Sequence, residues 1–237
     1  MPKRDRSSMQ QAVAEIRRRI LDLELRPGQR IDDIRLSSEL SLSRTPVREA
    51  LFHLSSDGLV EVGPRGGFAV RGLELLDIRE LFEAHLVLAR SVARLVVARA
   101  TDADLEALQA ANDAVNLAVA DGNPSGISRA NSELHQLEAR VARNAYLEML
   151  AGRIHGQGQR LAFLSFGGDG LADPDLARHY QTSCDDHAAS LLAFRARDAD
   201  LAEEIAARHV HLFRNRITTF LDTGLLEQVT LGDVVLP

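Results

Sequence analysis

The sequence predicts a mostly α-helical protein, in which an N-terminal winged helix-turn-helix precedes a C-terminal all-α helical bundle. Up to residue 71, three segments with apolar residues at helical spacing are followed by two short strand candidates. From residue 73 onward, the helical spacing continues with only short polar or glycine-rich breaks. We therefore expect two domains, residues 8–72 and residues 73–226, each long enough to bury a core.

The first two helices follow from their apolar spacing and from the residues that end them. A helix is expected over residues 9–23, before the Arg-Pro-Gly sequence at 26–28. A second, short helix is expected over roughly residues 33–41, with Ile34 and Leu40 turned toward the core. Together they form the first half of a helix-turn-helix.

The third helix is expected to begin at a cap formed by Ser43 or Thr45 and to end at the Asp-Gly pair at 57–58. Two strand candidates follow, residues 59–62 and 68–71, on either side of the turn sequence Gly-Pro-Arg-Gly-Gly. Three helices followed by a hairpin are the order of elements in a winged helix-turn-helix.

The remainder of the chain predicts helices without strands of comparable length. The expected helices are residues 75–100, 102–121, 124–142, 145–165, 173–196 and 198–223. Capping and turn residues separate them, including the Asp-Gly-Asn-Pro sequence at 121–124. Such a succession predicts an all-helical bundle.

Composition places the chain among ordinary globular proteins. Of its 237 residues, 45% are hydrophobic and 26% are charged. Cys184 is the single cysteine, so an intramolecular disulfide is excluded and a reducing compartment is favoured. The chain lacks an apolar run of the roughly 18–20 residues that a membrane span needs, and its N-terminus lacks the apolar core of a signal peptide. We expect a cytoplasmic protein with no membrane partner.

Charge is distributed unevenly along the chain, whose formal net charge is -6. Residues 1–71 contain 13 Lys and Arg against 10 Asp and Glu, whereas the remainder contains 15 against 24. A small DNA-binding module attached to an acidic domain would show this asymmetry. Ordinary variation in surface charge would explain it equally well, so charge alone does not decide the function.

The third helix carries the candidate DNA-binding residues, because this helix of a helix-turn-helix enters the major groove. An arginine there can bind guanine O6 and N7 with two hydrogen bonds, worth ~1 to 3 kcal/mol of discrimination. Hydroxyl groups and the helix N-terminus suit phosphate oxygens. The predicted DNA contacts are Arg35, Ser43, Arg44, Thr45 and Arg48, with Arg65 and Gly66 at the hairpin tip. The alternative is that Arg44 and Arg48 are solvated charges, with Arg48 paired to an acid.

Three histidines of the second domain fall on the inward faces of three different helices. His187 and His209 share these faces with apolar residues, and His135 lies one turn after Asn131. Imidazoles from three helices that converge in a bundle are typical of a metal site. Hydrogen-bonded core histidines remain the alternative at this point. We expect His155, His179 and His211 to be surface or structural residues.

Residues 12–71 resemble the GntR family of bacterial regulators. The resemblance lies in the Arg-Pro-Gly-Gln-Arg-Ile lead-in at 26–31, the Ser-Arg-Thr-Pro-Val-Arg-Glu-Ala-Leu run at 43–51, the Asp-Gly-Leu-Val exit at 57–60 and the wing at 65–70. It implies that Arg44, Thr45, Arg48 and the wing bind DNA. Ser41 departs from the pattern, since the family usually has glycine at this turn, and a positive φ costs energy without glycine.

Residues 75–223 resemble the FCD sensor domain of the FadR subgroup of that family. The matching residues imply that Asn131, His135, His187 and His209 bind one divalent metal. Imidazole suits several divalent metals, and we expect zinc for its availability, with nickel, manganese or iron as alternatives. Asn131 stands where metal-binding members have Asp, which should weaken the site. His85 stands where a pocket arginine is usual, and the resemblance places His85 and Asn144 at the effector pocket. The subgroup senses small organic acids, so a small carboxylate metabolite is the implied effector.

We therefore expect a transcriptional repressor, acting as a homodimer on a pseudo-palindromic double-stranded operator, because paired half-sites mirror a two-fold axis. A metal-dependent hydrolase is one alternative, but no spaced motif such as His-Glu-x-x-His supplies a general base, so we expect no enzyme. A constitutive architectural DNA-binding protein is the other alternative, and the large helical domain exceeds what dimerisation alone requires. A DNA-binding assay with and without candidate acids separates the three.

Overall fold

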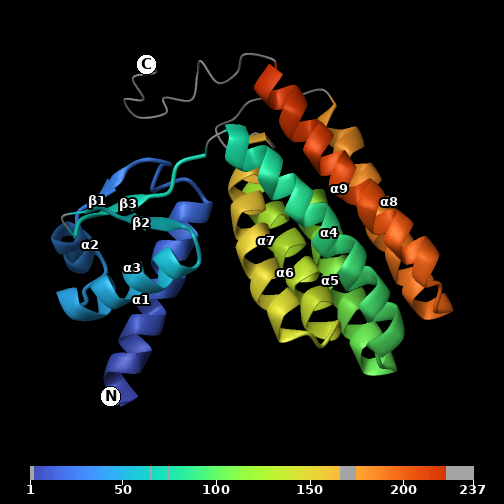
Figure 1. The fold of residues 1–237 in the computed structure, drawn as a ribbon, viewed down its shortest axis with the longest axis horizontal. Helices are drawn as coiled ribbons and strands as arrows, with labels where there is room; N and C mark the ends of the chain where they lie inside the picture. The colour runs from blue at the N-terminus through green and yellow to red at the C-terminus, as the bar shows by residue number, and fades with distance from the viewer. Residues whose placement is uncertain (1–2, 65, 74, 166–174, 223–237) are drawn as a thin grey trace. The chain divides into compact units, whose positions relative to one another are not determined.

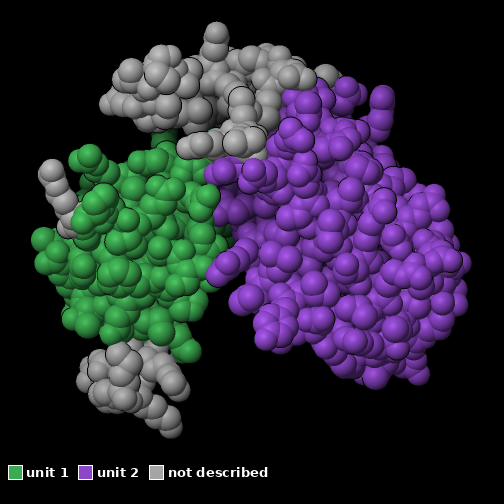
Figure 2. Space-filling model, viewed as in Figure 1, with its two compact units in different colours: residues 1–74, 227–237 green, residues 75–226 purple. Residues whose placement is uncertain are grey.

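The computed structural model describes residues 3–64, 66–73, 75–165 and 175–222. These residues form two compact units, one up to residue 73 and the other from residue 75 (Figure 2). The first unit combines helices with a small sheet, and the second consists of helices over its described residues (Figure 1). The predicted fold class, a winged helix-turn-helix followed by an all-α bundle, is confirmed.

The first unit contains three helices and a three-stranded antiparallel sheet. Its elements are α1 (Lys3–Leu21), β1 (Arg30–Ile31), α2 (Asp33–Glu39), α3 (Arg44–Ser56), β2 (Val60–Val62) and β3 (Phe68–Val70). The strand order is β1-β3-β2, so β3 lies in the middle and pairs with both neighbours. The strand β1 was not predicted, because two residues are too short to show the alternation that marks a strand.

The core of the first unit forms where α1 packs against α3. Ile16 and Ile20 of α1 meet Val47, Leu51 and Leu54 of α3, all fully buried. This contact removes a continuous apolar stripe of each helix from water, which is the main stabilising contribution of such a unit. It also fixes which side of α3 faces outward.

The prediction that Ile34 faces the core is wrong, since this side chain is 63% exposed. The helix α2 buries Asp33, Leu36 and Ser37 instead. The reason is its starting point: Asp32 caps the helix by accepting hydrogen bonds from the backbone N–H groups of Ile34 and Arg35. With that start, the inward positions begin one residue earlier than the apolar spacing suggested.

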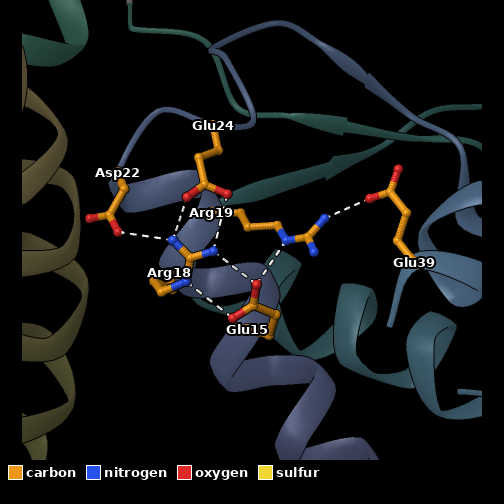
Figure 3. A network of polar contacts seen from close by, with 6 residues as sticks. All are labelled: Glu15, Arg18, Arg19, Asp22, Glu24 and Glu39. Atoms are coloured by element: carbon orange, nitrogen blue, oxygen red, sulfur yellow. Dashed lines mark hydrogen bonds and ion pairs between the residues drawn. The ribbon is translucent and has the colours of Figure 1, made fainter. Parts of the chain in front are cut away.

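A network of ion pairs joins the end of α1 to α2 (Figure 3). Glu15 accepts hydrogen bonds from Arg18 and Arg19, and these hydrogen bonds lower the pKa of Glu15 to about 2. Arg19 then reaches Glu39 of α2, with 2.6 Å between Nη1 and Oε2. Asp22 and Glu24 complete the network by accepting from Arg18. Because these groups are partly exposed, we regard the network as a minor contribution to stability.

The second unit is a bundle of helices over its described residues. Its elements are α4 (Leu75–Arg99), α5 (Asp102–Asp121), α6 (Pro124–Val141), α7 (Ala145–Ser165), α8 (Leu176–Ala196) and α9 (Ala199–Asp222). The helix α4 packs along α9, and α6 packs between α5 and α7. No helix in the described ranges is both long and apolar enough to cross a membrane.

Capping residues define the helix boundaries of the second unit. Thr101 and Asp104 form a reciprocal capping box at the start of α5, and Gly122 ends that helix with a φ of 64°. Asn123 then caps α6, with Pro124 as its first residue. Each of these signals satisfies backbone groups that a helix end leaves unpaired.

Ser41 occupies the turn between α2 and α3 with a φ of 54°, which confirms the expected left-handed conformation. Only glycine adopts this region without a steric cost. We predict that Ser41→Gly raises the free energy of unfolding of the first unit by about 0.5–1 kcal/mol. Urea unfolding of the variant and the wild type measures this difference.

Ser38→Gly is the matched control, because Ser38 is an exposed residue within α2. A glycine in a helix interior lowers stability by about 1 kcal/mol relative to a good helix former. The two serine-to-glycine substitutions should thus act in opposite directions. A destabilising effect at both positions would contradict the prediction.

Candidate DNA-binding face and metal centre

The recognition helix α3 presents its first arginines to an acid of α2. Arg44 donates from Nε and Nη2 to the two carboxylate oxygens of Asp33, at 2.9 and 3.2 Å. Arg48 donates from Nη1 to Asp33 Oδ2 at 2.8 Å. These hydrogen bonds, those of Arg44 first, lower the pKa of Asp33 despite its burial. Arg48 therefore pairs with an acid, and Arg44 pairs with the same acid, so neither is a freely solvated charge, and both side chains remain partly exposed.

Arg48 also lies against two aromatic rings. Its guanidinium carbon is 5.0 Å from the centroid of the buried Phe68 ring and 5.8 Å from that of Phe52. The two rings meet edge to face, with centroids 5.1 Å apart. This contact explains why an aromatic residue, Phe52, occupies the polar side of α3, where it is 48% exposed.

The remaining predicted DNA contacts that the structure describes are exposed. Ser43 is the N-cap residue of α3, yet its hydroxyl makes no capping hydrogen bond and stays available, as does exposed Thr45. Gly66 turns the wing with a φ of 79°, and it borders the same surface hollow as Thr45. Arg35 points away from the core and pairs with Glu39 at 2.8 Å. Arg65 lies outside the described residues.

Three histidines predicted as metal ligands come together in the second unit. His135 of α6, His187 of α8 and His209 of α9 each offer a ring nitrogen, and these nitrogens lie within 4.8 Å of one another. The closest approach is 3.3 Å, between Nε2 of His187 and Nε2 of His209. Spacing of this order suits ligands of one ion. The convergence that the sequence predicted is thus present in the fold.

Carboxylates lie behind two of these imidazoles, and one of the carboxylates, Glu138, is within hydrogen-bond distance. Nδ1 of His135 lies 2.9 Å from Glu138 Oε2, which leaves Nε2 of that ring directed elsewhere. Nδ1 of His209 lies 3.6 Å from Asp186 Oδ2, and Arg208 holds the other oxygen of Asp186 at 2.7 Å. A carboxylate behind a histidine fixes the tautomer in which the opposite nitrogen can bind a metal.

The chemistry of this donor set fits a divalent metal. Burial lowers the pKa of His187 and of His209, and the neighbouring imidazoles lower it further, which keeps both rings neutral. Nδ1 of His187 is buried without a hydrogen-bond partner among the described residues. Neutral imidazoles that the protein does not saturate with hydrogen bonds are what a metal site requires.

Two further histidines extend the cluster. His155 of α7 stacks on His135 with ring centroids 5.4 Å apart, and His85 of α4 meets His155 edge to face at 5.1 Å. Burial lowers the pKa of His85 to about 3 and that of His155 well below its usual range. His155 was expected to be a surface or structural residue, but it belongs to the cluster, because its position one turn after buried Ala151 is an inward one.

A cavity of about 60 Å³ opens beside this cluster. His85 and Asn131 line it, and so do His179 and Tyr180 of α8, so His179 belongs to the cavity wall. The volume is enough for a few water-sized groups. Asn144 is placed elsewhere: its Oδ1 accepts hydrogen bonds from two backbone N–H groups at the start of α7, and it is not part of the cavity lining.

Comparisons with known proteins agree with this arrangement. Residues 80–212 match the model of the FCD domain, and residues 8–70 match that of the bacterial regulatory proteins of the gntR family. The HTH-type transcriptional regulator YdhC of Bacillus subtilis is 26% identical over 166 residues, which are 70% of this chain and 74% of that protein. The HTH-type transcriptional repressor RspR of Escherichia coli is 22% identical over 85% of each chain. The structure of E. coli McbR/YncC matches 91% of this chain and 98% of its own, with a TM-score of 0.76 at 20% identity, which shows the fold alone.

The lowered imidazole pKa values predict that acid destabilises the second unit. An unfolded histidine has a pKa of about 6.5, whereas that of His85 in the folded unit is about 3. Between these values the unfolded chain binds more protons, so the stabilisation that is complete above pH 6.5 is lost as the pH falls. For His85 the loss at pH ~5 is about 2 kcal/mol. Urea unfolding of chelator-treated protein at neutral and acidic pH measures it.

His85→Gln is the comparison variant, because glutamine is neutral at every pH. Its free energy of unfolding should fall less between neutral pH and pH ~5 than that of the wild type, by about 2 kcal/mol. The comparison depends only on how the free energy of unfolding changes with pH. A loss of packing in the variant lowers that free energy equally at every pH and does not affect the comparison. Equal slopes in the two proteins would show that His85 does not stay neutral in the folded unit.

Proposed function

The chain belongs to the GntR family of bacterial regulatory proteins and carries an FCD domain, and from this premise we propose a repressor whose operator affinity is controlled by a small carboxylate. Members of this family are transcriptional regulators rather than enzymes, as the sequence analysis expected. The observation that carries the proposal is the histidine cluster beside a cavity, in a chain that also carries an arginine-bearing recognition helix. One unit is suited to DNA and the other to a small ligand.

The ligand site is proposed to hold one divalent metal through His135, His187 and His209, with Asn131 as a weak fourth ligand. Zinc is favoured for its availability among the metals that imidazole suits, with nickel, manganese and iron as alternatives. When bound, the metal supplies positive charge to a site whose described lining contains imidazole, amide and hydroxyl groups but no Lys or Arg. A carboxylate effector needs that charge, since burying an unpaired anion is costly. His85 and His155 border the same space as hydrogen-bonding groups.

Repression is proposed from a relative of this chain, RspR, which is named as a repressor. A repressor that is released from its operator by a metabolite is the simplest form of such control.

Dimerisation is proposed from the size of the DNA contact. One recognition helix contacts only a few base pairs, so a homodimer on a pseudo-palindromic operator supplies the missing sequence information. Because bacterial operators lie in the cytoplasm, the protein is proposed to act there.

Operator binding is predicted to depend on both arginines at the start of α3. Arg48→Ala should lose ~1 to 3 kcal/mol of specific binding and relax the preference at one base position, and Arg44→Ala should behave similarly at another. The operator is first selected from random duplexes by the wild-type protein, and a footprint should show two half-sites. Unchanged affinity and selectivity in both variants, or a single half-site bound by a monomer, would contradict the proposal.

Metal content is predicted to be one divalent ion per chain in protein purified without chelator or affinity tag. His187→Ala should lose this ion, and Asn131→Asp should bind it more tightly because a carboxylate adds charge. His53→Ala is the matched control, since exposed His53 lies in the first unit. Elemental analysis gives the content, and operator binding with a panel of small carboxylates gives the response.

The response to the effector should disappear with the metal, while operator binding without effector should persist. This separation follows because the two sites lie in different units. A protein that ignores added zinc and nickel but still responds to a carboxylate would show that the histidines are core or pocket residues only. A protein that responds to none of the carboxylates in either state would refute the proposed effector class.

A further inference from the structure

We infer that Asp33 is the positioning residue of the DNA-binding face: it holds Arg44 and Arg48 as one array, on which discrimination between DNA sequences depends. The inference rests on the proposed function, because it assigns the cause of that specificity. Asp33 was not among the expected DNA contacts, and the apolar spacing had turned its neighbour Ile34 toward the core. Its role becomes visible only in the contact between α2 and α3.

Asp33 is placed to orient other side chains and not to contact bases itself. Its side chain is only 13% exposed, and both of its oxygens already accept hydrogen bonds from guanidinium groups. A carboxylate that recognises a base must instead reach the amino group of cytosine. Asp33 therefore bonds to Arg44 and Arg48 and does not contact bases in the major groove of DNA.

The geometry leaves Arg44 able to recognise guanine. Asp33 engages the edge of Arg44 formed by Nε and Nη2. The end of the guanidinium, where Nη1 and Nη2 lie side by side, keeps its two N–H groups free for guanine O6 and N7. Asp33 thus fixes the plane of the guanidinium without using the edge that would contact the base.

Arg48 is held from two directions. Asp33 accepts from its Nη1, and the rings of Phe68 and Phe52 lie beside its guanidinium. An arginine that is already ordered loses less rotamer freedom on binding, which is worth roughly 0.5–1.5 kcal/mol for each such side chain. This saving in free energy corresponds to a roughly three- to tenfold increase in affinity. This increase in affinity applies only where the fixed position of the guanidinium matches the bases of the DNA. It therefore favours binding to the matching sequence.

The charge of Asp33 acts in the same direction. Two arginines with one carboxylate carry a net charge of one, which weakens the sequence-independent attraction to phosphate. Removing the carboxylate would free both guanidinium groups to follow phosphates of any sequence. Specificity is the difference between the affinity for the matching sequence and the affinity for other sequences. Asp33 raises the first affinity and lowers the second.

Asp33→Asn is the test, because asparagine has the same shape and lacks the charge. The wild-type protein and the variant are titrated with the selected operator and with a random duplex of equal length. We expect the ratio of the two dissociation constants to fall by roughly three- to tenfold, with random-duplex affinity unchanged or increased. In an Arg44→Ala background the same substitution should change the ratio less, because one of its two partners is gone.

Asp57→Asn is the matched control, since Asp57 also pairs with an arginine of the first unit, Arg17, which is not among the predicted DNA contacts. It should leave the ratio unchanged. If Asp33→Asn fails to fold by circular dichroism, Asp33→Glu replaces it, and a displaced carboxylate should again lower the ratio. An unchanged ratio in a folded Asp33 variant, or an equal loss for both duplexes, would overturn the inference. It would leave the proposed function intact as long as Arg44→Ala and Arg48→Ala lose operator binding.

Discussion

The cost of taking polar groups out of water shapes both functional regions of this chain. A buried carboxylate or imidazole is tolerated only if it is paired, or if it stays neutral. In the first unit, Asp33 is paired, because it accepts three hydrogen bonds from two arginines. In the second unit, the clustered histidines stay neutral instead, because burial lowers the pKa of His85 and His187. The same constraint thus produces a paired charged array in one unit and a set of neutral imidazoles in the other.

The connectivity of the chain relates these two regions. His85 lies on α4 and His209 on α9, which pack along one another, so a ligand bound at the cluster would contact the helix that begins the second unit. That helix starts at Leu75, five residues after β3 ends at Val70. In sequence, the first helix of the second unit thus follows the last strand of the first unit almost directly.

Much of the fold could be predicted from the sequence because its signals are local. The capping box at Thr101 and the proline after Asn123 depend on neighbours a few residues away, and the helix ends they predict agree with the structure to within a few residues. The convergence of His135, His187 and His209 was also predictable, since His187 and His209 share helix faces with apolar residues and His135 shares one with Asn131. The family resemblance added the expectation that all three meet at one ion.

The features that escaped prediction depend on partners far apart in the sequence. Asp33 and Arg48 are 15 residues apart, and nothing near Asp33 in the chain shows that a carboxylate there would be satisfied. Phe52 looks misplaced on a polar helix face until β3 supplies Phe68 beneath the same guanidinium. The arginines of α3 were therefore predicted as independent contacts, whereas the fold makes them members of one assembly. Because each member limits the motion of the next, the specificity of such a face belongs to the assembly and cannot be divided among its residues.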